Sequence, residues 1–508
     1  MIKLRFPPLK SDQKFFILNI VVGLCAGVVA IFFHQSIHKL MHWFGTDLGF
    51  TPKSFLLGGT SLFIGGYITT RIVPECGGSG IPRTKILIAV HHSIIKTREW
   101  LVKIGVTILS LASGVPLGSE GPTIAISAGI GSSLGRKFNF KQKELKSLVY
   151  AGCSAGIAAA FNTPIAAVIF TMEEMIGVSN NKSMGPILIS SLVASVTAAA
   201  LIGQNSIFTP VHYSFNATWD QLAFYVGLGV FAGLAGPLFM SNILGIKKLI
   251  KKYFKHHRLT VIMTSFVLVG ILSQIVKEVP GNGLSVINQL LQGKVDSLTI
   301  LVALLVFKFL ASAFCYGAGI SGGILMPVLF LGAALGGIFG SLSSYTLGIE
   351  QVEIGAYCLV GMGAFFASVI RTPFTSIVLV FEMTRDYRII LPLMLANLVA
   401  YFLSEKIMKG NLYEKMALFE GYELPHHEEE EYLIHSLVET VYVPVESYEE
   451  EHMSYAHFIY TDQTLAYALN KLKKLGMNKE LKVVNRMNSK EVIGVINLQN
   501  IFDYVSKD

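Results

Sequence analysis

Three glycine-rich breaks interrupt the apolar sequence of this chain, and one of them carries an acid. They are Gly78-Ser79-Gly80-Ile81-Pro82, Gly118-Ser119-Glu120-Gly121-Pro122 and Gly322-Gly323-Ile324-Leu325-Met326-Pro327. Irregular backbone is tolerated in a bilayer only where protein buries it or where it lines a cavity. Each break is followed by an apolar run that favours a helix, so free N–H groups and positive helix ends should point at a common place. Such a place would bind an anion, and Glu120 is a negative charge that competes for it.

The composition around these breaks predicts a membrane protein. The chain has 508 residues, of which 52% are hydrophobic and 15% are charged, and its mean hydropathy is +0.56. A soluble protein carries about 25% charged residues. Apolar runs long enough to span a bilayer recur from about Phe15 to Met408, which indicates a polytopic domain. The first run, 16–33, has no small-residue cleavage site after it, so we expect a retained helix and not a signal peptide.

The charges lie mainly outside the apolar runs. The net charge of +8 is concentrated in residues 1–14, 136–146 and 247–258. The positive-inside rule puts such segments in the cytoplasm and predicts two cytoplasmic termini in a bacterial-type inner or plasma membrane. A nucleic-acid partner is not expected, because the basic residues flank membrane segments. The five cysteines lack C-x-x-C spacing, which indicates buried small residues and neither disulfides nor metal ligands.

The sequence around the breaks is repeated. Three pairs of segments match in the same order, at offsets of 203, 205 and 209 residues: 78–81 with 281–284, 118–122 with 323–327, and 162–170 with 371–379. The membrane domain therefore reads as two related halves, about 15–205 and 217–410, with a transport site at their interface. In the last register Glu173 falls on Glu382, which favours a shared structural role such as helix capping over a role in the pathway.

In their order and spacing, the breaks resemble the selectivity-filter motifs of the CLC family of chloride channels and chloride/proton exchangers. The run from Gly152 to Pro164, which continues to Glu173-Glu174, resembles the same family, and the similarity covers about 15–416. The resemblance implies an all-α polytopic fold of two inverted halves with tilted, broken helices. It also implies a homodimer in which each subunit holds its own anion pathway.

The resemblance also implies which groups bind chloride. The Ser79 hydroxyl, the backbone amides of Ile324 and Leu325, and the hydroxyl of Tyr413 in Asn411-Leu412-Tyr413 match the family's central site. Hydroxyls and neutral amides replace the hydration of chloride without holding the ion too tightly to leave. No metal and no cofactor besides chloride and protons is expected.

Two acids match the family's proton-handling residues. Glu120 matches the gating glutamate, which blocks the outer anion site when ionised and swings away when protonated. Glu174 matches the inner glutamate that relays protons from the cytoplasm in exchangers. An anion nearby and a poorly hydrated pocket both favour a protonated carboxyl, so chloride entry and proton uptake support one another. The function expected is secondary active chloride/proton antiport, and the alternative is a passive chloride channel of the same fold.

This chain departs from the family pattern beside the gate. Ser119 stands where an arginine or lysine is usual, and the loss of that cation should weaken the stabilisation of ionised Glu120. Transport is therefore expected to turn on at higher pH than in relatives with the basic residue. Leu325 replaces a common aromatic but contributes its backbone, whereas Met326 replaces a small residue and is expected to alter the width of the outer pathway.

Other polar residues in apolar sequence have plainer explanations. Lys103 and Lys308 are expected to snorkel or to be paired. His34, His38 and His42 recur on one helix face, but without a cysteine or acid nearby they indicate an interfacial polar stripe more than a metal site. An intramembrane hydrolase would need a nucleophile with a paired base, and no histidine or lysine is arranged beside the serines of the breaks. The chain is therefore not expected to be an enzyme.

The tail after about residue 423 is soluble in character. A charged linker, 417–432, is followed by an expected α/β domain, 433–508, with helices at 461–475 and 498–505 and strands at 481–484 and 492–496. Its end resembles one CBS (cystathionine β-synthase) module. Such modules usually come in pairs, and 433–458 is at best a degenerate partner. Adenine nucleotide binding is therefore not expected, and a cytoplasmic domain that stabilises a dimer is the simpler reading.

Overall fold

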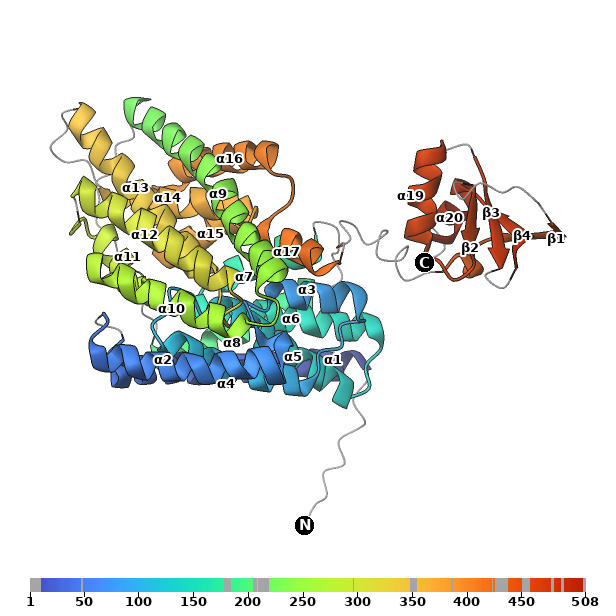
Figure 1. The fold of residues 1–508 in the computed structure, drawn as a ribbon, viewed down its shortest axis with the longest axis horizontal. Helices are drawn as coiled ribbons and strands as arrows, with labels where there is room; N and C mark the ends of the chain where they lie inside the picture. Colours follow the sequence, from blue (N-terminus) through green and yellow to red (C-terminus); the bar gives the residue numbers. More distant parts are fainter. Residues whose placement is uncertain are drawn as a thin grey trace, which may run out of the picture. The chain divides into compact units, whose positions relative to one another are not determined.

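The computed structural model describes residues 11–46, 49–177, 184–203, 208, 219–295, 297–347, 354–384, 387–422, 424, 437–449, 457–476, 479–485 and 488–505. The chain divides into a large unit, 1–88 with 92–423, and a small unit, 89–91 with 424–508. Figure 1 shows the large unit as helices that cross at many angles, and the small unit as a sheet with helices beside it.

The large unit repeats one series of helices twice. The first series is α1 (Ser11–Phe44), α2 (Pro52–Tyr67), α3 (Ile81–Val90), α4 (Thr97–Ala112), α5 (Glu120–Lys137), α6 (Gln142–Phe161), α7 (Pro164–Phe170) and α8 (Met184–Ile202). The second series is α9 (Trp219–Tyr253), α10 (Arg258–Ile275), α11 (Leu284–Leu291), α12 (Leu298–Gly317), α13 (Leu325–Leu347), α14 (Ile354–Val369), α15 (Pro373–Thr384) and α16 (Ile390–Ile407), followed by α17 (Leu412–Glu420). The dominant contacts repeat as well, because α5 packs on α6 as α13 packs on α14, and α1 on α8 as α9 on α16.

Many of these helices suit a bilayer. Within the described residues, seven helices are long and apolar enough to cross a membrane, from Asp12–Phe44 to Ile390–Glu420. Other helices, such as α3, α7 and α11, are too short to span and belong to broken segments. The expectation of a multi-pass, all-α membrane domain is confirmed.

Glycines allow the central helices to approach closely. A Cβ on Gly131 of α5 would collide with the backbone of Leu148 in α6, and a Cβ on Gly336 of α13 would collide with the backbone of Tyr357 in α14. Small residues permit such backbone contact between membrane helices, where no hydrophobic driving force pulls them together. The two collisions occur at equivalent places in the two halves, 205 residues apart, which is one of the offsets seen in the sequence.

Backbone bonds at the breaks show that a pseudo-two-fold axis relates the halves. Gly118 and Gly323 form an antiparallel bridge, with N–H···O distances of 2.8 Å from Gly118 and 2.5 Å from Gly323. The Gly78 amide donates to the Gly319 carbonyl, and in the equivalent bond the Gly281 amide donates to Gly114. Reciprocal contacts of this kind are the mark of a two-fold relation.

Two lysines hold the loops that precede α3 and α11. Lys103 Nζ of α4 donates to the Cys76 and Gly78 carbonyls at 3.0 and 2.5 Å. Lys308 Nζ of α12, the equivalent residue, donates to the Val279 and Gly281 carbonyls at 2.7 Å each. Both lysines are buried. Of the two expectations for them, pairing is confirmed, although the partners are carbonyl groups, and snorkelling is not.

Glu173 and Glu382 each cap the N-terminus of a helix in the opposite half. The Glu173 carboxylate accepts the Phe374 and Thr375 amides at the start of α15, at 3.3 and 2.8 Å. The Glu382 carboxylate accepts the amides of residues 165 and 166 at the start of α7, at 3.1 and 2.6 Å. An acid at a helix N-terminus satisfies free N–H groups and complements the helix dipole. The expected shared capping role is confirmed.

The small unit is a mixed sheet with two helices. Its strands are β1 (Val443–Glu449), β2 (Phe458–Tyr460), β3 (Leu481–Asn485) and β4 (Asn488–Ile496), its helices are α19 (Leu465–Leu475) and α20 (Leu498–Val505), and the spatial order of the strands is β1-β4-β3-β2. Strand β2 pairs parallel to β3, and the other neighbours are antiparallel. The two helices and two strands expected from the sequence are confirmed, whereas β1 and β2 lie in or next to the segment that we took for a degenerate module.

The capping acids should matter for stability and not for proton coupling. Glu173→Gln and Glu382→Gln each remove a charge from a helix N-terminus, so each should lower the free energy of unfolding by about 1–2 kcal/mol. We expect similar falls in the apparent melting temperature of the purified protein in detergent. Because the two acids are symmetry-equivalent, a large loss for one variant and none for the other would contradict the reciprocal capping.

Candidate functional site

The three breaks meet at one place in the large unit. A Cβ on Gly121, in the first turn of α5, would lie 2.9 Å from the Ser79 Cβ and 3.3 Å from the Gly323 Cα. A Cβ on Gly323 would in turn lie 2.9 Å from the Gly121 amide. Three segments that are far apart in the sequence are thus in van der Waals contact through glycines. The expected convergence of the three breaks is confirmed.

The Ser79 hydroxyl is oriented by two donors. Tyr316, at the end of α12, donates its hydroxyl to Ser79 Oγ at 3.2 Å, and the Ile81 amide donates to the same oxygen at 3.3 Å. Because Oγ accepts from both, its own proton is available to an acceptor placed beside it. The sequence did not point to Tyr316, because it lies 237 residues from Ser79 and is one aromatic among many in apolar sequence.

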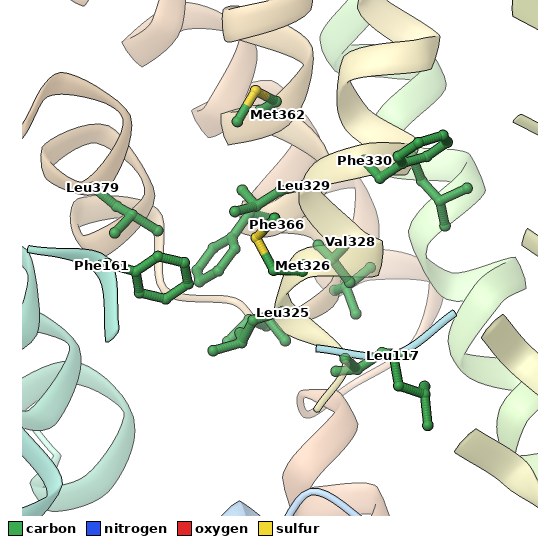
Figure 2. Close-up of a cluster of buried hydrophobic side chains, with 14 of the residues drawn as sticks. Leu117, Phe161, Leu325, Met326, Val328, Leu329, Phe330, Met362, Phe366 and Leu379 are labelled. Atoms are coloured by element: carbon green, nitrogen blue, oxygen red, sulfur yellow. The ribbon is translucent and has the colours of Figure 1, made fainter. Parts of the chain in front are cut away.

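The third break supplies backbone donors. Ile324 and Leu325 stand at the start of α13 and are buried, and no backbone carbonyl of the described residues accepts from their amides. The first N–H groups of a helix have no acceptor within it and are free to bind an anion. Figure 2 shows the Leu325 and Met326 side chains in an apolar cluster with Phe366, so the polar groups that these two residues offer at the break are those of their backbone. The effect of Met326 on the pathway stays a prediction.

Tyr413 closes the group of hydroxyls. It lies in the first turn of α17, whose N-terminus is capped by the Asn411 side chain at 2.9 Å from the Glu414 amide. The Tyr413 side chain is fully buried, and its hydroxyl has no hydrogen-bond partner among the residues that the structure describes. The phenol interacts electrostatically with Tyr316, Glu174 and Glu120. An unpartnered buried hydroxyl is costly, so a site with this arrangement favours an occupant that accepts its proton.

Glu120 occupies the start of α5 and is 3% exposed. The backbone amides of Ser119, Glu120 and Met326 face its carboxylate, and within the described part of the chain its Oε2 has no hydrogen-bond partner. The carboxylate folds back over Gly118, where a Cβ would collide with Oε2. The acid therefore sits where helix N-termini from both halves converge, which is where an anion would bind.

Glu174 is held by two side chains. Its Oε1 lies 2.6 Å from Lys85 Nζ, and its Oε2 accepts a hydrogen bond from the Asn411 side-chain Nδ2 at 2.8 Å. It belongs to a π-helical turn, Thr171–Ile176, which directly continues α7. π-Turns often occur at functional sites, because they re-aim side chains. The signal for Lys85 was its charge inside a short apolar helix, which marks a functional candidate by default, but the sequence could not name its partner.

One expectation about the first helix is wrong. His34 of α1 lies with its Nδ1 3.3 Å from the Ser119 hydroxyl, so it does not simply belong to an exposed interfacial stripe with His38. It follows that a serine of the breaks does have a histidine beside it, contrary to what the sequence suggested. The acid in contact with this pair, Glu120, bonds the serine and not the imidazole, so the arrangement differs from a hydrolytic triad.

Family membership follows from the comparisons with known proteins. Residues 60–405 match the family model described as voltage gated chloride channel. The chain belongs to the CLC family. The H(+)/Cl(−) exchange transporter ClcA of Vibrio cholerae is 31% identical over 421 residues, which cover 80% of this chain and 90% of that protein.

Solved structures agree on the CLC fold. A slow cyanobacterial Cl−/H+ antiporter matches with a TM-score of 0.73 and 25% identity, over 81% of this chain and 99% of that one. A eukaryotic CLC transporter matches with a TM-score of 0.68 and 18% identity, over 97% of this chain and 88% of that one. At the second identity the likeness concerns the fold alone. The expected CLC fold of the membrane unit is confirmed.

The seat of Glu120 over Gly118 gives a prediction for the gate of this CLC protein. Gly118→Ala places a methyl group where Oε2 lies, and the flexible glutamate side chain is the part that can move. We expect the variant to fold and to keep Glu120 out of its seat, so that chloride flux rises and depends less on pH. Flux from reconstituted liposomes across a pH series measures this. Wild-type flux with an unaltered pH profile would contradict the role of Gly118.

Proposed function

We propose that this protein is a secondary active antiporter that exchanges chloride for protons. The observation that carries the proposal is the position of Tyr413. Its hydroxyl, which has no hydrogen-bond partner among the described residues, is close enough to both Glu120 and Glu174 to interact electrostatically with them, so one candidate anion ligand lies near two buried acids. The similarity to the Vibrio exchange transporter and to the cyanobacterial antiporter supports the same function.

Chloride would be bound by neutral donors only. The Ser79 hydroxyl, which Tyr316 and Ile81 orient, would donate to the ion together with the Tyr413 hydroxyl and the amides of Ile324 and Leu325. These donors replace hydration without a full positive charge, so the bound ion can leave. No resident cofactor enters this scheme.

Glu120 would act as gate and as outer proton acceptor. In its ionised form the carboxylate occupies the convergent N–H groups that an anion would use, so carboxylate and chloride exclude one another. Protonation removes the charge that holds the carboxyl there, and chloride takes its place. Each opening thus binds a proton, which couples the two substrates.

Glu174 would pass the proton to the opposite side of the membrane. Only 1% of its side chain is exposed. We infer that this buried acid relays protons between Glu120 and the cytoplasm by a route separate from the chloride pathway. The resemblance to CLC proteins further supports a homodimer with one pathway in each subunit. The basic segments favour two cytoplasmic termini, and the single legible CBS-like module in the tail disfavours bound nucleotide. A bacterial-type inner or plasma membrane fits the same picture.

One experiment separates antiport from passive conduction. The full chain is reconstituted in liposomes, and a chloride gradient is imposed while proton movement is recorded. We expect protons to move uphill. Glu174→Gln should abolish proton movement and leave chloride flux, whereas Glu120→Gln should abolish proton movement and make chloride flux independent of pH. Chloride flux without any proton movement in the unmodified protein would establish a channel instead.

Glu173→Gln is the matched control for Glu174→Gln. It changes the neighbouring acid, which caps α15, so it should lower stability and retain the exchange. Loss of coupling in both variants would mean that any carboxylate change in this turn disturbs transport, and the assigned role of Glu174 would fall.

Lys85 should tune the inner proton step. Its ammonium group holds the Glu174 carboxylate, and a proton must compete with it for that site. Lys85→Met removes the competitor, so coupled proton movement should persist to higher pH than in the unmodified protein. Arg83→Gln on the same helix is the control, because Arg83 is more exposed and approaches Glu99 at 3.7 Å. Equal effects of the two variants would contradict a specific role for Lys85.

A further inference from the structure

A chain of polar groups leads from α1 to the gate. His34 Nδ1 lies 3.3 Å from Ser119 Oγ, and the same hydroxyl lies 3.4 Å from Glu120 Oε1. The imidazole and the carboxylate thus lie on either side of a single serine hydroxyl. Ser119 itself carries no charge, and the imidazole that contacts its hydroxyl comes from another helix, α1.

The imidazole is placed where its interactions count. His34 Nε2 is buried and has no hydrogen-bond partner in the described ranges, and Ser119 and Glu120 are 5% and 3% exposed. Helices α2, α4, α5, α6 and α8 pack on α1. Among the described residues, the titratable group that interacts directly with His34 is His38, one turn further along α1, and the acid reached through Ser119 is Glu120 of α5. No acid is available to bind His34 Nε2 in that part of the chain.

The serine has one proton to give, and His34 decides where it goes. When Nδ1 carries a proton, the imidazole donates to Ser119 Oγ, and the serine proton is free to donate to the Glu120 carboxylate. When Nδ1 is bare, it accepts the serine proton, and the carboxylate loses that donor. Protonation of His34 fixes a hydrogen on Nδ1, whereas neutral His34 with its hydrogen on Nε2 leaves Nδ1 bare, so the change between these two states alters the number of donors to ionised Glu120.

We propose that His34 is a positioning residue of the outer gate, which acts on Glu120 through the Ser119 hydroxyl and gives the gate a second proton-binding group. The proposal rests on the proposed function, because it concerns the same gating acid. Protonated His34 strengthens the seat of the ionised carboxylate, so it opposes opening at acidic pH, where protonation of Glu120 itself promotes opening. The relay thus takes over part of what an adjacent cation would do.

The test is the pH profile of chloride flux from liposomes that hold the full chain. Ser119→Ala removes the donor to Glu120, so it should shift the midpoint to higher pH by about 0.5–1 unit. His34→Ala removes the competing acceptor and leaves the serine proton to Glu120, so it should shift the midpoint to lower pH. The double variant should match Ser119→Ala, because His34 acts only through the serine hydroxyl. His34→Asn, whose amide oxygen can accept the serine proton as bare Nδ1 does, should return the midpoint towards that of the unmodified protein.

Two further variants sharpen the result. His38→Asn makes the same change one turn away, at an exposed position, and should leave the profile unchanged. Ser119→Arg places a cation beside Glu120 and should shift the midpoint to lower pH, after which His34→Ala should have no effect. A profile that His34→Ala and Ser119→Ala leave unaltered, or a double variant that differs from Ser119→Ala, would overturn the relay.

The outcomes also separate this inference from the proposed function. The unmodified protein is measured first, and its failure to move chloride or protons would overturn the antiport itself. Normal coupled exchange that does not respond to His34→Ala or Ser119→Ala would overturn the relay alone and leave the antiport in place.

Discussion

The pairing of Gly118 with Gly323 is the interaction on which the rest of the site depends. Backbone groups inside a bilayer must find partners within the protein, and these two glycines satisfy each other across the pseudo-two-fold axis. The bridge ends there, so among the described residues no backbone carbonyl accepts from the first amides of α5 and α13, and some of them face the Glu120 carboxylate. A side chain on Gly323 would meet the Gly121 backbone, so the close approach needs glycine. One backbone contact therefore places both helix starts around the candidate anion site.

The two halves share a scaffold and differ in chemistry. Lys103 and Lys308 tie equivalent loops, and Glu173 and Glu382 cap equivalent helices, so these four charges serve the fold in a symmetric way. The groups that can handle an ion are not symmetric. The break at Glu120 adds a titratable carboxylate, whereas its counterpart at Leu325 adds only backbone. The scaffold is therefore symmetric, but only one of its two halves contributes an acid at the break. This asymmetry lets one site handle two different substrates, an anion and a proton.

The part of the site that lies in contiguous motifs could be predicted, and the part that depends on packing could not. Ser79, Glu120 and the amides of Ile324 and Leu325 belong to breaks whose residue types already indicate their chemistry. The duplication also revealed the capping pair, since acids at equivalent positions of the two halves favour a shared structural role. Tyr316 and Lys85 lie on helices whose rotation and crossing decide their neighbours. His34 reads as part of a polar stripe until α1 is laid against α5, 85 residues away.

In the antiport that we propose, coupling follows from competition between the Glu120 carboxylate and chloride for the same N–H groups. A site that bound chloride through a lysine or arginine would hold both anions too firmly, and neither would leave at a useful rate. With neutral donors the balance is close, and a single proton on Glu120 decides it. For the same reason one hydrogen bond at the edge of the seat has leverage, because it adds to a small difference between two occupants. The Ser119 hydroxyl lies beside the carboxylate, so the group that orients its proton also affects the pH at which chloride displaces Glu120.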